Sequence, residues 1–304
     1  MKDGFSVVIP AFNYGHCLER AVTSAISQDY PEFEVIVIND GSEDDTADVA
    51  DRLAARWPER VRVVHQANAG LSAVRNRGVD EAAFHWLVFL DADDEFCPGA
   101  LAAMAASAKA TPEARLVIGG HIADDGIQRV PVVPAPVRDG DPVGALRAFL
   151  DKRLTISNGA CAMHRALFRT TRYDPALRHT EDLPVFAHVL ANYPVTTTDA
   201  PITVIHKHPG SMRHDLDAAL RVGMALEAAI FDDNGLPAWA QRFRRYYRAR
   251  RALSLLKLAD RGGRPDLVRR FFASALAADW RQALHPRYLR RYFVSFFKRN
   301  GSGP

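Results

Sequence analysis

Four short apolar runs, separated by stretches with helical spacing, set the main constraint on how this chain folds. The runs cover residues 5–10, 34–39, 61–65 and 86–90. The stretches between them, residues 16–28, 44–56 and 71–83, read as helices, and Ser42 is expected to cap the second one. Strands that alternate with helices in this way form a parallel, doubly wound α/β sheet, because each helix packs back onto the sheet.

The rest of the chain first continues this pattern and then becomes helical. We expect a helix over residues 98–110, a strand over residues 115–121 and a loop rich in Pro, Gly and Asp over residues 124–141. Beyond about Ser211 the pattern is helical, with no clear strand. A chain of 304 residues that is 48% hydrophobic can bury the core of one large domain with an appendage.

Cysteine usage and hydropathy bear on the compartment. Cys17, Cys97 and Cys161 are odd in number and lack the spacing of a disulfide framework or a zinc site, which indicates a reducing compartment. The apolar run at residues 5–10 is too short for a signal peptide, and no run approaches the roughly 18 residues of a membrane span. We therefore expect a cytoplasmic protein, either free or bound peripherally at the inner face of the membrane.

The net charge of +3 hides a strong asymmetry. Residues 239–304 hold 17 Lys and Arg against 3 acids, a net of +14, whereas the remainder holds 22 against 33, a net of −11. The same 66 C-terminal residues contain 12 of the 28 aromatic residues. A charge split of this kind indicates that the two parts have separate roles.

Three carboxylates follow the apolar run at residues 86–90, in the motif Asp91-Ala92-Asp93-Asp94. Ligands of parallel α/β sheets bind outside the carboxyl ends of the strands, where this motif is expected to lie. Neighbouring carboxylates repel one another, and a divalent cation removes that cost. Hard oxygen ligands suit Mg²⁺ or Mn²⁺, which commonly bridge to substrate phosphates. The alternative interpretation is an acidic, solvated turn.

Three further motifs accompany the acidic one: Pro10-Ala11-Phe12-Asn13-Tyr14, Asn39-Asp40-Gly41-Ser42, and the stretch from Asn68 through Gly70 and Arg75 to Gly78. The first two end predicted strands, and the third opens a predicted helix. None is a GxGxxG or GxxxxGK[ST] loop, so a dinucleotide oxidoreductase or a P-loop protein lacks its fingerprint here. Taken singly, the second motif also fits a turn with a helix cap, and Arg75 fits an ordinary surface arginine.

Together, these four motifs resemble, in order and spacing, the successive signatures of family 2 glycosyltransferases with the GT-A fold. The resemblance is strong over residues 1–100 and weaker to about Arg213. It implies a catalytic domain over residues 1–213, with a nucleotide-binding half (1–100) and an acceptor half (101–213), followed by a basic, aromatic helical region over residues 214–304. It also implies inverting transfer of a sugar from a nucleotide-sugar, usually UDP-linked, to an acceptor hydroxyl.

The resemblance implies a role for each donor-site residue. Asp40 would contact the base, and the nucleotide pocket would be shaped by Pro10, Ala11, Asn13, Asn68 and Gly70. Arg75 would lie near the diphosphate or orient Asp91. Asp91 would sit near the ribose or metal-bound waters, and Asp93 would bind Mn²⁺ or Mg²⁺ directly. His208, in the motif His206-Lys207-His208-Pro209-Gly210-Ser211, would be a third metal ligand or a diphosphate contact. His206 stands where the family often has Arg.

The resemblance places the general base in the motif Thr180-Glu181-Asp182-Leu183-Pro184. Asp182 matches the position of the base, and Glu181 would hold acceptor or donor hydroxyls. The alternative interpretation is a helix N-terminus, where acids are favoured by the helix dipole and Thr180 or Asp182 acts as the cap. The stretch from Asn158 to Met163 would line the acceptor or donor-sugar pocket.

Two basic stretches with interleaved aromatic residues lie in the C-terminal region. Residues 242–251 hold six arginines, and residues 285–299 place aromatic side chains three and four positions apart between basic ones. Such helices suit an anionic membrane surface, packing on the catalytic domain or a homo-oligomer interface, and the sequence leaves these three open. Interleaved Arg and Tyr also suit nucleic acid, which the family resemblance argues against.

We therefore predict a metal-dependent, inverting glycosyltransferase that acts on a glycan or lipid-linked acceptor, as in bacterial capsule or lipopolysaccharide assembly. A non-catalytic nucleotide- or sugar-binding protein of the same fold is the first alternative. Such a protein is expected to have lost acidic residues of the site, yet the four aspartates of the motifs are all present: Asp40, Asp91, Asp93 and Asp182. A metal-dependent nucleotidyltransferase is the second alternative, and the uncharged loop Asn13-Tyr14-Gly15-His16 argues against it.

Overall fold

The computed structural model describes residues 2–177, 180–207, 216–232 and 235–298. It contains nine strands, all of them in one sheet: β1 (Lys2–Ala11), β2 (Phe33–Asp40), β3 (Val61–Gln66), β4 (Phe84–Phe89), β5 (Glu95–Phe96), β6 (Leu116–Asp124), β7 (Arg129–Val132), β8 (Cys161–His164) and β9 (Val195–His206). The α-helices are α1 (Gly15–Ile26), α2 (Thr46–Arg56), α3 (Leu71–Glu81), α4 (Ala100–Ala110), α5 (Pro142–Leu150), α6 (Asp182–Asn192), α7 (Leu216–Val222), α8 (Ala225–Phe231), α9 (Arg244–Arg261), α10 (Pro265–Ala278), α11 (Trp280–Ala283) and α12 (Pro286–Val294).

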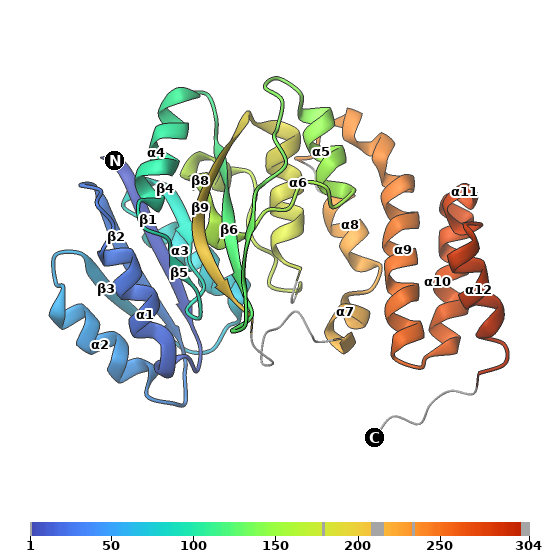
Figure 1. Cartoon of the computed structure of the whole chain (residues 1–304), viewed down its shortest axis with the longest axis horizontal. Helices are drawn as coiled ribbons and strands as arrows, with labels where there is room; N and C mark the ends of the chain where they lie inside the picture. Colours follow the sequence, from blue (N-terminus) through green and yellow to red (C-terminus); the bar gives the residue numbers. More distant parts are fainter. Residues whose placement is uncertain (1, 178–179, 208–215, 233–234, 299–304) are drawn as a thin grey trace. The chain divides into compact units, whose positions relative to one another are not determined.

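The sheet has the order β3-β2-β1-β4-β8-β6-β9-β5, with β7 paired to β6 (Figure 1). The first four strands are parallel to one another, which confirms the predicted doubly wound arrangement. The later part is mixed, because β8 is antiparallel to both β4 and β6 while β6 and β9 are parallel. The sequence pattern did not reveal β8 and β9, since β8 is only four residues long and β9 begins with a polar stretch, Thr196-Thr197-Thr198-Asp199.

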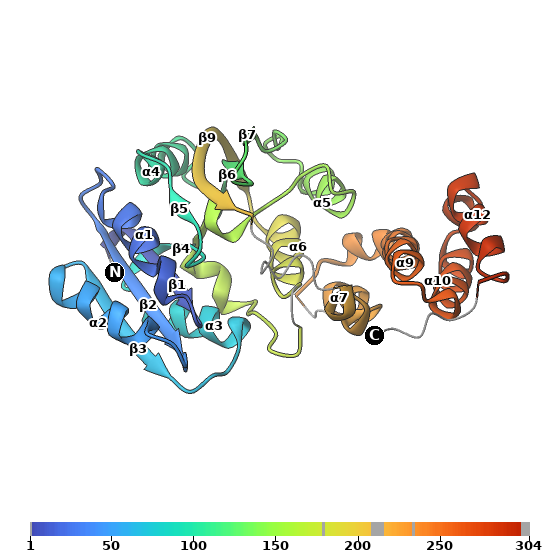
Figure 2. The ribbon, with the colours of Figure 1, turned by 60° about the horizontal axis from the view of Figure 1, so that its bottom comes forward.

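Side chains of β1 alternate between the two faces of the sheet. Val7 and Ile9 belong to the core that includes Leu18 of α1 and Val49 of α2, so α1 and α2 cover one face. Val8 points to the opposite face, where α3 lies so close that a Cβ on Gly78 would be 2.5 Å from the Val8 side chain. The two faces and their helices can be followed in Figures 1 and 2.

Two local predictions are wrong. Ser42 does not cap α2, which begins at Thr46, because the Ser42 hydroxyl instead accepts a hydrogen bond from the Asn13 backbone N–H. The expected loop over residues 124–141 contains the strand β7, which pairs with the end of β6. Its alternation of Val with Arg and Pro is too short to be recognised as a strand pattern.

The chain divides into two compact units. The first comprises Met1–Ala176 and Val185–Pro209, and the second comprises Leu177–Pro184 and Gly210–Pro304. The second unit has its own apolar core, formed by α9, α10 and α12 around residues such as Leu256, Phe272 and Tyr288. Within the described ranges, no helix has both the length and the apolar character needed to cross a bilayer.

Candidate functional site

Strands β2, β1 and β4 are neighbours in the sheet and parallel, so their carboxyl ends lie side by side. Chain connections from β1 lead toward β2 and β3, whereas the connection from β3 through α3 returns past β1 to β4. The edge between β1 and β4 is therefore the topological switch point, where ligands of open α/β sheets bind. Three of the four motifs singled out in the sequence follow these strand ends.

The loop after β1 is fastened to the loop after β2. The Asn13 N–H donates to the Ser42 hydroxyl (3.0 Å), and the Glu43 N–H donates to the Asn13 side-chain oxygen (2.8 Å). Asn13 has a φ of 60°, a left-handed conformation that Asn tolerates better than most residues. Phe12, held between these anchors, keeps 42% of its surface exposed and presents an aromatic ring beside the switch point.

A second pair of bonds extends this fastening to the start of α1. The Tyr14 N–H donates to the Thr46 hydroxyl (2.9 Å), and the Gly15 N–H donates to the Asp44 carboxylate (3.2 Å). A Cβ on Gly15 would lie 1.9 Å from a carboxylate oxygen of Asp45, so a larger residue at this position would displace the exposed Asp45 side chain. These four hydrogen bonds join the loop after β1 to the loop after β2 along one side of the candidate site.

Asp40 holds the loop that precedes α3. One carboxylate oxygen accepts from the Gln66 side chain (2.8 Å) and the Ala69 N–H (2.9 Å), and the other accepts from the Gly70 N–H (2.9 Å). The carboxylate is only 3% exposed. The sequence resemblance implied that Asp40 contacts the nucleotide base. It did not reveal this anchoring role, because the N–H groups that Asp40 accepts from, those of Ala69 and Gly70, lie about 30 residues away.

Arg75 is not the ordinary surface arginine of the alternative interpretation. It is 3% exposed, and its guanidinium lies 3.4 Å from the Asp91 carboxylate and 5.5 Å from the ring centroid of Tyr173. A buried guanidinium held by one carboxylate and one aromatic face has little freedom to move. The structure thus brings Arg75 and Asp91 together at the carboxyl end of β4.

Tyr173 is a site residue that sequence reasoning missed. Its ring is buried beneath Arg75, and its hydroxyl donates to the Asn158 side chain (3.0 Å). Its backbone makes two hydrogen bonds with the Asn76 side chain, 2.8 and 3.0 Å long, which tie this segment to α3. Asn158 itself is buried in a short 3-10 helix, so the stretch from Asn158 to Met163 contributes mainly to the interior.

The acidic motif after β4 contains two kinds of carboxylate. Asp94 is 4% exposed and accepts a hydrogen bond from the backbone N–H of His206 (2.9 Å), so it joins the turn to β9. Asp91 and Asp93 are partly exposed. Arg20 of α1 donates to the backbone carbonyl of Asp93. The motif is therefore more than a solvated turn, since one of its acids is structural and the other two border the switch point.

The electrostatic effect of Asp93 reaches α1 and the residue before it. The pKa of Tyr14 is raised above its ordinary value, first by burial and then by the charges of Asp93 and Asp91. The pKa of the Cys17 thiol is raised to about 11, again first by burial and then by Asp93. Both shifts indicate a negative potential at this edge, which favours a bound cation and disfavours an isolated anion.

The donor chemistry of Asp91 and Asp93 fits Mg²⁺ or Mn²⁺ in the manner of phosphate-bridging sites. Among the described residues, no three His, Cys, Asp or Glu side chains are grouped closely enough to hold a metal by themselves. Mg²⁺ is usually held by one or two carboxylates together with substrate phosphates and water, so an incomplete protein ligand set is expected before substrate binds. His208, the third predicted ligand, lies outside the described residues.

His206 is engaged in the sheet and does not replace the arginine common at its position. Its Nε2 lies 3.1 Å from the Glu95 carboxylate, and its Nδ1 lies 3.7 Å from the Asp124 carboxylate. These contacts link the end of β9 to β5 and β6. Positive charge for a diphosphate would come from Arg75 or Arg20.

Glu181 and Asp182 belong to the second unit and are described separately. Asp182 is the first residue of α6 and is partly exposed, whereas Glu181 is 5% exposed. The Leu183 N–H donates to the Thr180 carbonyl (3.3 Å), but the buried Thr180 hydroxyl has no hydrogen-bond partner within the described part of the chain. Thr180 is thus not the expected cap, and acids at this helix start fit the dipole.

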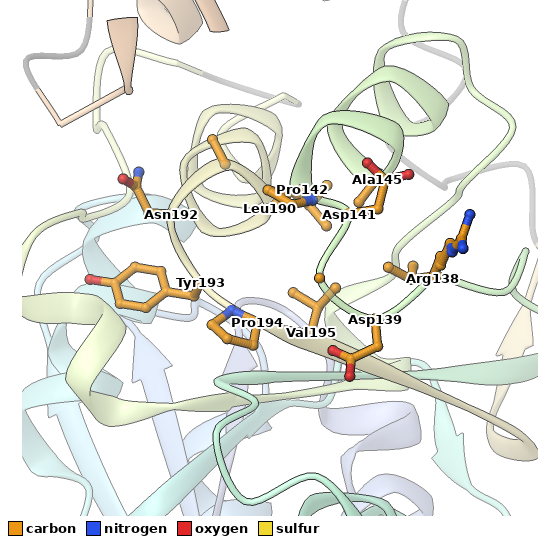
Figure 3. Close-up of a pocket in the computed structure, with 13 residues that line it drawn as sticks. Arg138, Asp139, Asp141, Pro142, Ala145, Leu190, Asn192, Tyr193, Pro194 and Val195 are labelled. Atoms are coloured by element: carbon orange, nitrogen blue, oxygen red, sulfur yellow. The ribbon is translucent and has the colours of Figure 1, made fainter. Parts of the chain in front are cut away.

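A cavity of about 180 Å³ lies elsewhere in the first unit (Figure 3). Its lining comes from the loop before α5 and the link from α6 to β9, including Asp141, Leu190, Tyr193 and Val195. Val195 starts β9, which runs in the same direction as β4, so the cavity lies toward the opposite edge of the sheet from Asp91. Two of its polar lining residues are engaged in the fold, since Asp141 caps α5 and the Tyr193 hydroxyl bonds Thr170 (2.9 Å).

The known proteins that this chain resembles in sequence are glycosyltransferases. Residues 6–169 match the family model described as glycosyl transferase family 2. An uncharacterized glycosyltransferase, YibD of Escherichia coli K12, is 44% identical over 93 residues, 31% of this chain and 27% of that protein. A GalNAc(5)-diNAcBac-PP-undecaprenol β-1,3-glucosyltransferase of Campylobacter jejuni is 37% identical over 101 residues, 33% of this chain and 32% of its own. The matches therefore span less than a third of these relatives.

Two solved structures share the fold over nearly the whole chain. Residues 1–349 of TarS from S. aureus, in complex with UDP-GlcNAc, superpose with a TM-score of 0.62 at 18% identity, covering 93% of each chain. The mannosyltransferase PcManGT of Pyrobaculum calidifontis, in complex with GDP-Man and Mn²⁺, gives a TM-score of 0.61 at 19% identity, covering 98% of this chain and 85% of its own. At this identity the likeness shows the fold alone, which is the predicted GT-A fold with a helical C-terminal region.

Proposed function

The chain belongs to glycosyl transferase family 2, and from that premise we propose that it is a metal-dependent, inverting glycosyltransferase that uses a UDP-sugar. The observation that carries the proposal is the grouping of Asp91, Asp93 and the buried Arg75 at the switch point of the sheet, next to the fastened loops after β1 and β2. This is the edge at which such sheets bind nucleotides. Two solved TarS structures hold UDP-GlcNAc and UDP, which supports UDP as the first donor nucleotide to test.

For the nucleotide, we propose a pocket between the two fastened loops. Phe12 offers an exposed ring on which a base can stack, an interaction that contributes on the order of 1–3 kcal/mol per base. Asp40 fixes the backbone at Ala69 and Gly70, and its carboxylate is the acceptor proposed for a base N–H. Pro10, Ala11, Asn13 and Asn68 complete the pocket in this proposal.

For the diphosphate, we propose that Arg75 supplies positive charge and that Asp91 and Asp93 hold Mg²⁺ or Mn²⁺. The bound metal would offset the negative charge that develops on the departing diphosphate. Arg75 is fixed in place between Asp91 and Tyr173 before substrate arrives, so its charge needs no reorganisation during the reaction. GDP-Man and Mn²⁺ in the structure of PcManGT support a metal in this fold.

We propose Asp182 as the general base. The acceptor hydroxyl would lose its proton to Asp182 while its oxygen bonds to the anomeric carbon, as the bond from that carbon to the UDP oxygen breaks. Attack from the face opposite UDP inverts the configuration. Glu181 would hold acceptor or donor hydroxyls. The Campylobacter relative, named for an undecaprenol-linked acceptor, supports lipid-linked glycans as the first acceptors to test, as in bacterial surface glycan assembly.

Binding of UDP to the parent protein and to Asp93→Asn, with Mn²⁺ and with EDTA, tests the donor site. We expect Mn²⁺ to strengthen UDP binding to the parent by at least tenfold and to have little effect on Asp93→Asn, as measured by isothermal titration calorimetry. Asp29→Asn, an exposed carboxylate on the loop after α1, is the matched control and should behave like the parent. Equal UDP affinity of the parent with and without Mn²⁺ would reject the metal site, and absence of UDP binding would reject the donor proposal.

A further inference from the structure

The end of the second unit exposes a group of aromatic side chains. Phe293 in α12 is 59% exposed, and Phe296 and Phe297 in the following turn are 56% and 90% exposed. A single exposed aromatic side chain is common on soluble proteins. Three within five consecutive residues form an apolar patch, and such patches mark interaction sites.

The opposite side of the same helix is packed, so the orientation of the patch is fixed. Tyr288 is 6% exposed, and Tyr292 stacks on Phe272 of α10 with ring centroids 4.1 Å apart. Ser295 is buried and accepts a hydrogen bond at its carbonyl from Arg269 (2.8 Å). One face of this stripe packs onto α10 within the helical unit, and Phe293 and Phe297 lie on the outer side.

Basic side chains from two helices flank the aromatic patch. The segment from α11 to the residues after α12 reaches both ends of α9, because Gln282 of α11 bonds Tyr246 near the start of α9 and Lys298 bonds Asp260 near its end. Asp260 also binds Arg291 (3.1 Å), so one carboxylate serves two cations. The basic residues of this surface are Arg250, Lys257 and Arg261 on α9 and Arg287, Arg290, Arg291 and Lys298 on or just after α12.

The cations are close enough to affect one another. The pKa of Lys257 lies below its ordinary value, first because of its burial and then because of the charges of Arg287, Arg261, Arg291 and Arg250. Like charges held together in this way are destabilising for a soluble protein on its own, and an anionic partner removes the repulsion.

The other basic stretch, residues 242–251, differs in this respect. Arg244 and Arg248 both bind the buried carboxylate of Glu227, at 2.5 and 3.3 Å, and Arg251 donates to the Gly223 carbonyl (2.9 Å). These three arginines hold α9 against the preceding helices. The cations of α9 and α12 that act on Lys257 form a second basic group, on the same helical segment as the aromatic patch.

We propose that Phe293, Phe296 and Phe297, with the flanking cations of α9 and α12, form a docking surface for an anionic phospholipid membrane. Aromatic rings enter the interfacial region while Arg and Lys contact lipid phosphates, which is the composition of helices that lie on membranes. The charge of residues 239–304, 17 basic against 3 acidic, complements such a surface. A second copy of this chain carries the same positive charge, which opposes self-association through this patch.

Sedimentation with vesicles tests the proposal on the full chain. The probes are vesicles of phosphatidylcholine alone and of phosphatidylcholine with 30% phosphatidylglycerol. We expect binding to the anionic vesicles only, weakened by raising salt from about 0.1 to 0.5 M. Phe293→Ser/Phe297→Ser should lose at least tenfold in vesicle affinity, and Arg287→Gln/Arg290→Gln should lose about fivefold for each cation removed.

Matched controls lie in the first unit. Ile127→Ser removes a side chain that is 95% exposed, and Arg52→Gln/Arg153→Gln removes two exposed arginines. Both controls should bind anionic vesicles like the parent, and thermal unfolding should confirm that all variants are folded. Equal binding by the parent and both patch variants would overturn the proposal, as would equal binding to neutral and anionic vesicles. A parent dimer in analytical ultracentrifugation that Phe293→Ser/Phe297→Ser converts to monomer, without vesicle binding, would assign the patch to self-association instead.

Discussion

Two acidic motifs, one after β4 and one at the start of α6, each combine a buried carboxylate with a partly exposed one. In the first, Asp94 is 4% exposed and Asp93 is partly exposed; in the second, Glu181 is 5% exposed and Asp182 is partly exposed. The motifs differ in what offsets their charge. In the β4 motif the Arg75 guanidinium contacts the Asp91 carboxylate and Arg20 donates to the backbone carbonyl of Asp93, whereas the α6 motif lies at a helix N-terminus, whose dipole favours acids.

The comparison teaches that two neighbouring acids of the same motif can differ in burial, so that one holds the fold and the other faces solvent. Asp94 uses an oxygen to hold the backbone of β9, so it contributes to the fold. Asp93 and Asp182 keep access to solvent, as the roles that we propose for them require. If this distinction is right, substitutions within each motif should affect either stability or chemistry, and the predictions below are ordered by the size of the expected effect.

The largest effect is expected at Asp182. Asp182→Asn removes the proposed proton acceptor at nearly constant volume, and loss of a positioned general base lowers rates by about 10²–10⁴-fold. We expect kcat for sugar transfer to fall by that factor while UDP affinity stays within about twofold of the parent. Transfer rates with an identified acceptor, together with calorimetry for UDP, check both parts.

The neighbour Glu181 provides the contrast for that experiment. Because Glu181 is buried, Glu181→Ala should lower the free energy of unfolding by about 1–3 kcal/mol, whereas Asp182→Asn should change it by less than about 0.5 kcal/mol. Turnover of Asp182→Asn within threefold of the parent would assign the base to another residue. Equal destabilisation by the two substitutions would remove the distinction between buried and exposed acids in this motif.

The β4 motif gives the second prediction. Asp94→Ala leaves the His206 N–H without its acceptor, and a buried polar group left unsatisfied costs about 1–3 kcal/mol. Asp93→Asn removes a partly exposed charge and should leave the free energy of unfolding within about 0.5 kcal/mol of the parent. Urea denaturation of both variants measures the difference. A stability loss for Asp93→Asn as large as that for Asp94→Ala would contradict the assignment.

The sequence predicted the first half of the fold well, and it placed the motifs of the proposed donor site at the ends of neighbouring strands, for a physical reason. Each of the first strands is a short apolar run, with β1 and β2 buried on both faces, and each motif lies at the end of one of these strands or opens α3. Position along the chain therefore implies position in space. The second half could not be predicted in this way, because β8 pairs antiparallel with two strands that are far from it in sequence.

Interactions across long sequence separations also escaped the sequence reasoning. Tyr173 lies about 100 residues from Arg75 and Asn76, which it contacts, and no local pattern marks it as a site residue. Likewise, nothing in the sequence distinguishes Asp40 and Asp94 from exposed aspartates. Only the fold shows that their carboxylates accept hydrogen bonds from backbone N–H groups. The two basic stretches of the second unit are alike in composition, and only the fold shows their different partners: Arg244 and Arg248 share the buried Glu227, whereas Arg291 and Lys298 share Asp260.

Substitution of Tyr173 should lower the free energy of unfolding less than Asp94→Ala does, for the same physical reason. Tyr173→Phe keeps the ring beneath Arg75 but removes the hydroxyl that donates to Asn158, so a buried acceptor loses its partner. We expect the free energy of unfolding to fall by about 1 kcal/mol and UDP affinity to stay near the parent value. Tyr173→Leu also removes the aromatic face and should weaken UDP binding in addition. Equal UDP affinity of the two variants would show that the ring does not position Arg75.

The smallest expected effect measures the potential at the acidic edge directly, through Cys17. Burial and the charge of Asp93 raise the pKa of this thiol to about 11, so at pH 8 little of it is thiolate, the form that reacts with iodoacetamide. Asp93→Asn removes the second of these causes, and the labelling rate of Cys17 should rise on the order of threefold. Asp29→Asn should leave the rate unchanged, because Asp29 is not among the charges that act on Cys17.

The same labelling experiment tests the proposed metal site. If Asp91 and Asp93 hold Mg²⁺, saturating Mg²⁺ with UDP should raise the labelling rate of Cys17 in the parent and not in Asp93→Asn. Labelling with UDP alone is the control that shows whether bound UDP leaves the thiol accessible. Mass spectrometry of the peptide that contains Cys17 gives the rate apart from Cys97 and Cys161. An unchanged labelling rate in Asp93→Asn would mean that burial alone raises the pKa of Cys17. The charge of Asp93 would then not reach the start of α1, and the negative potential inferred for this edge of the sheet would be wrong.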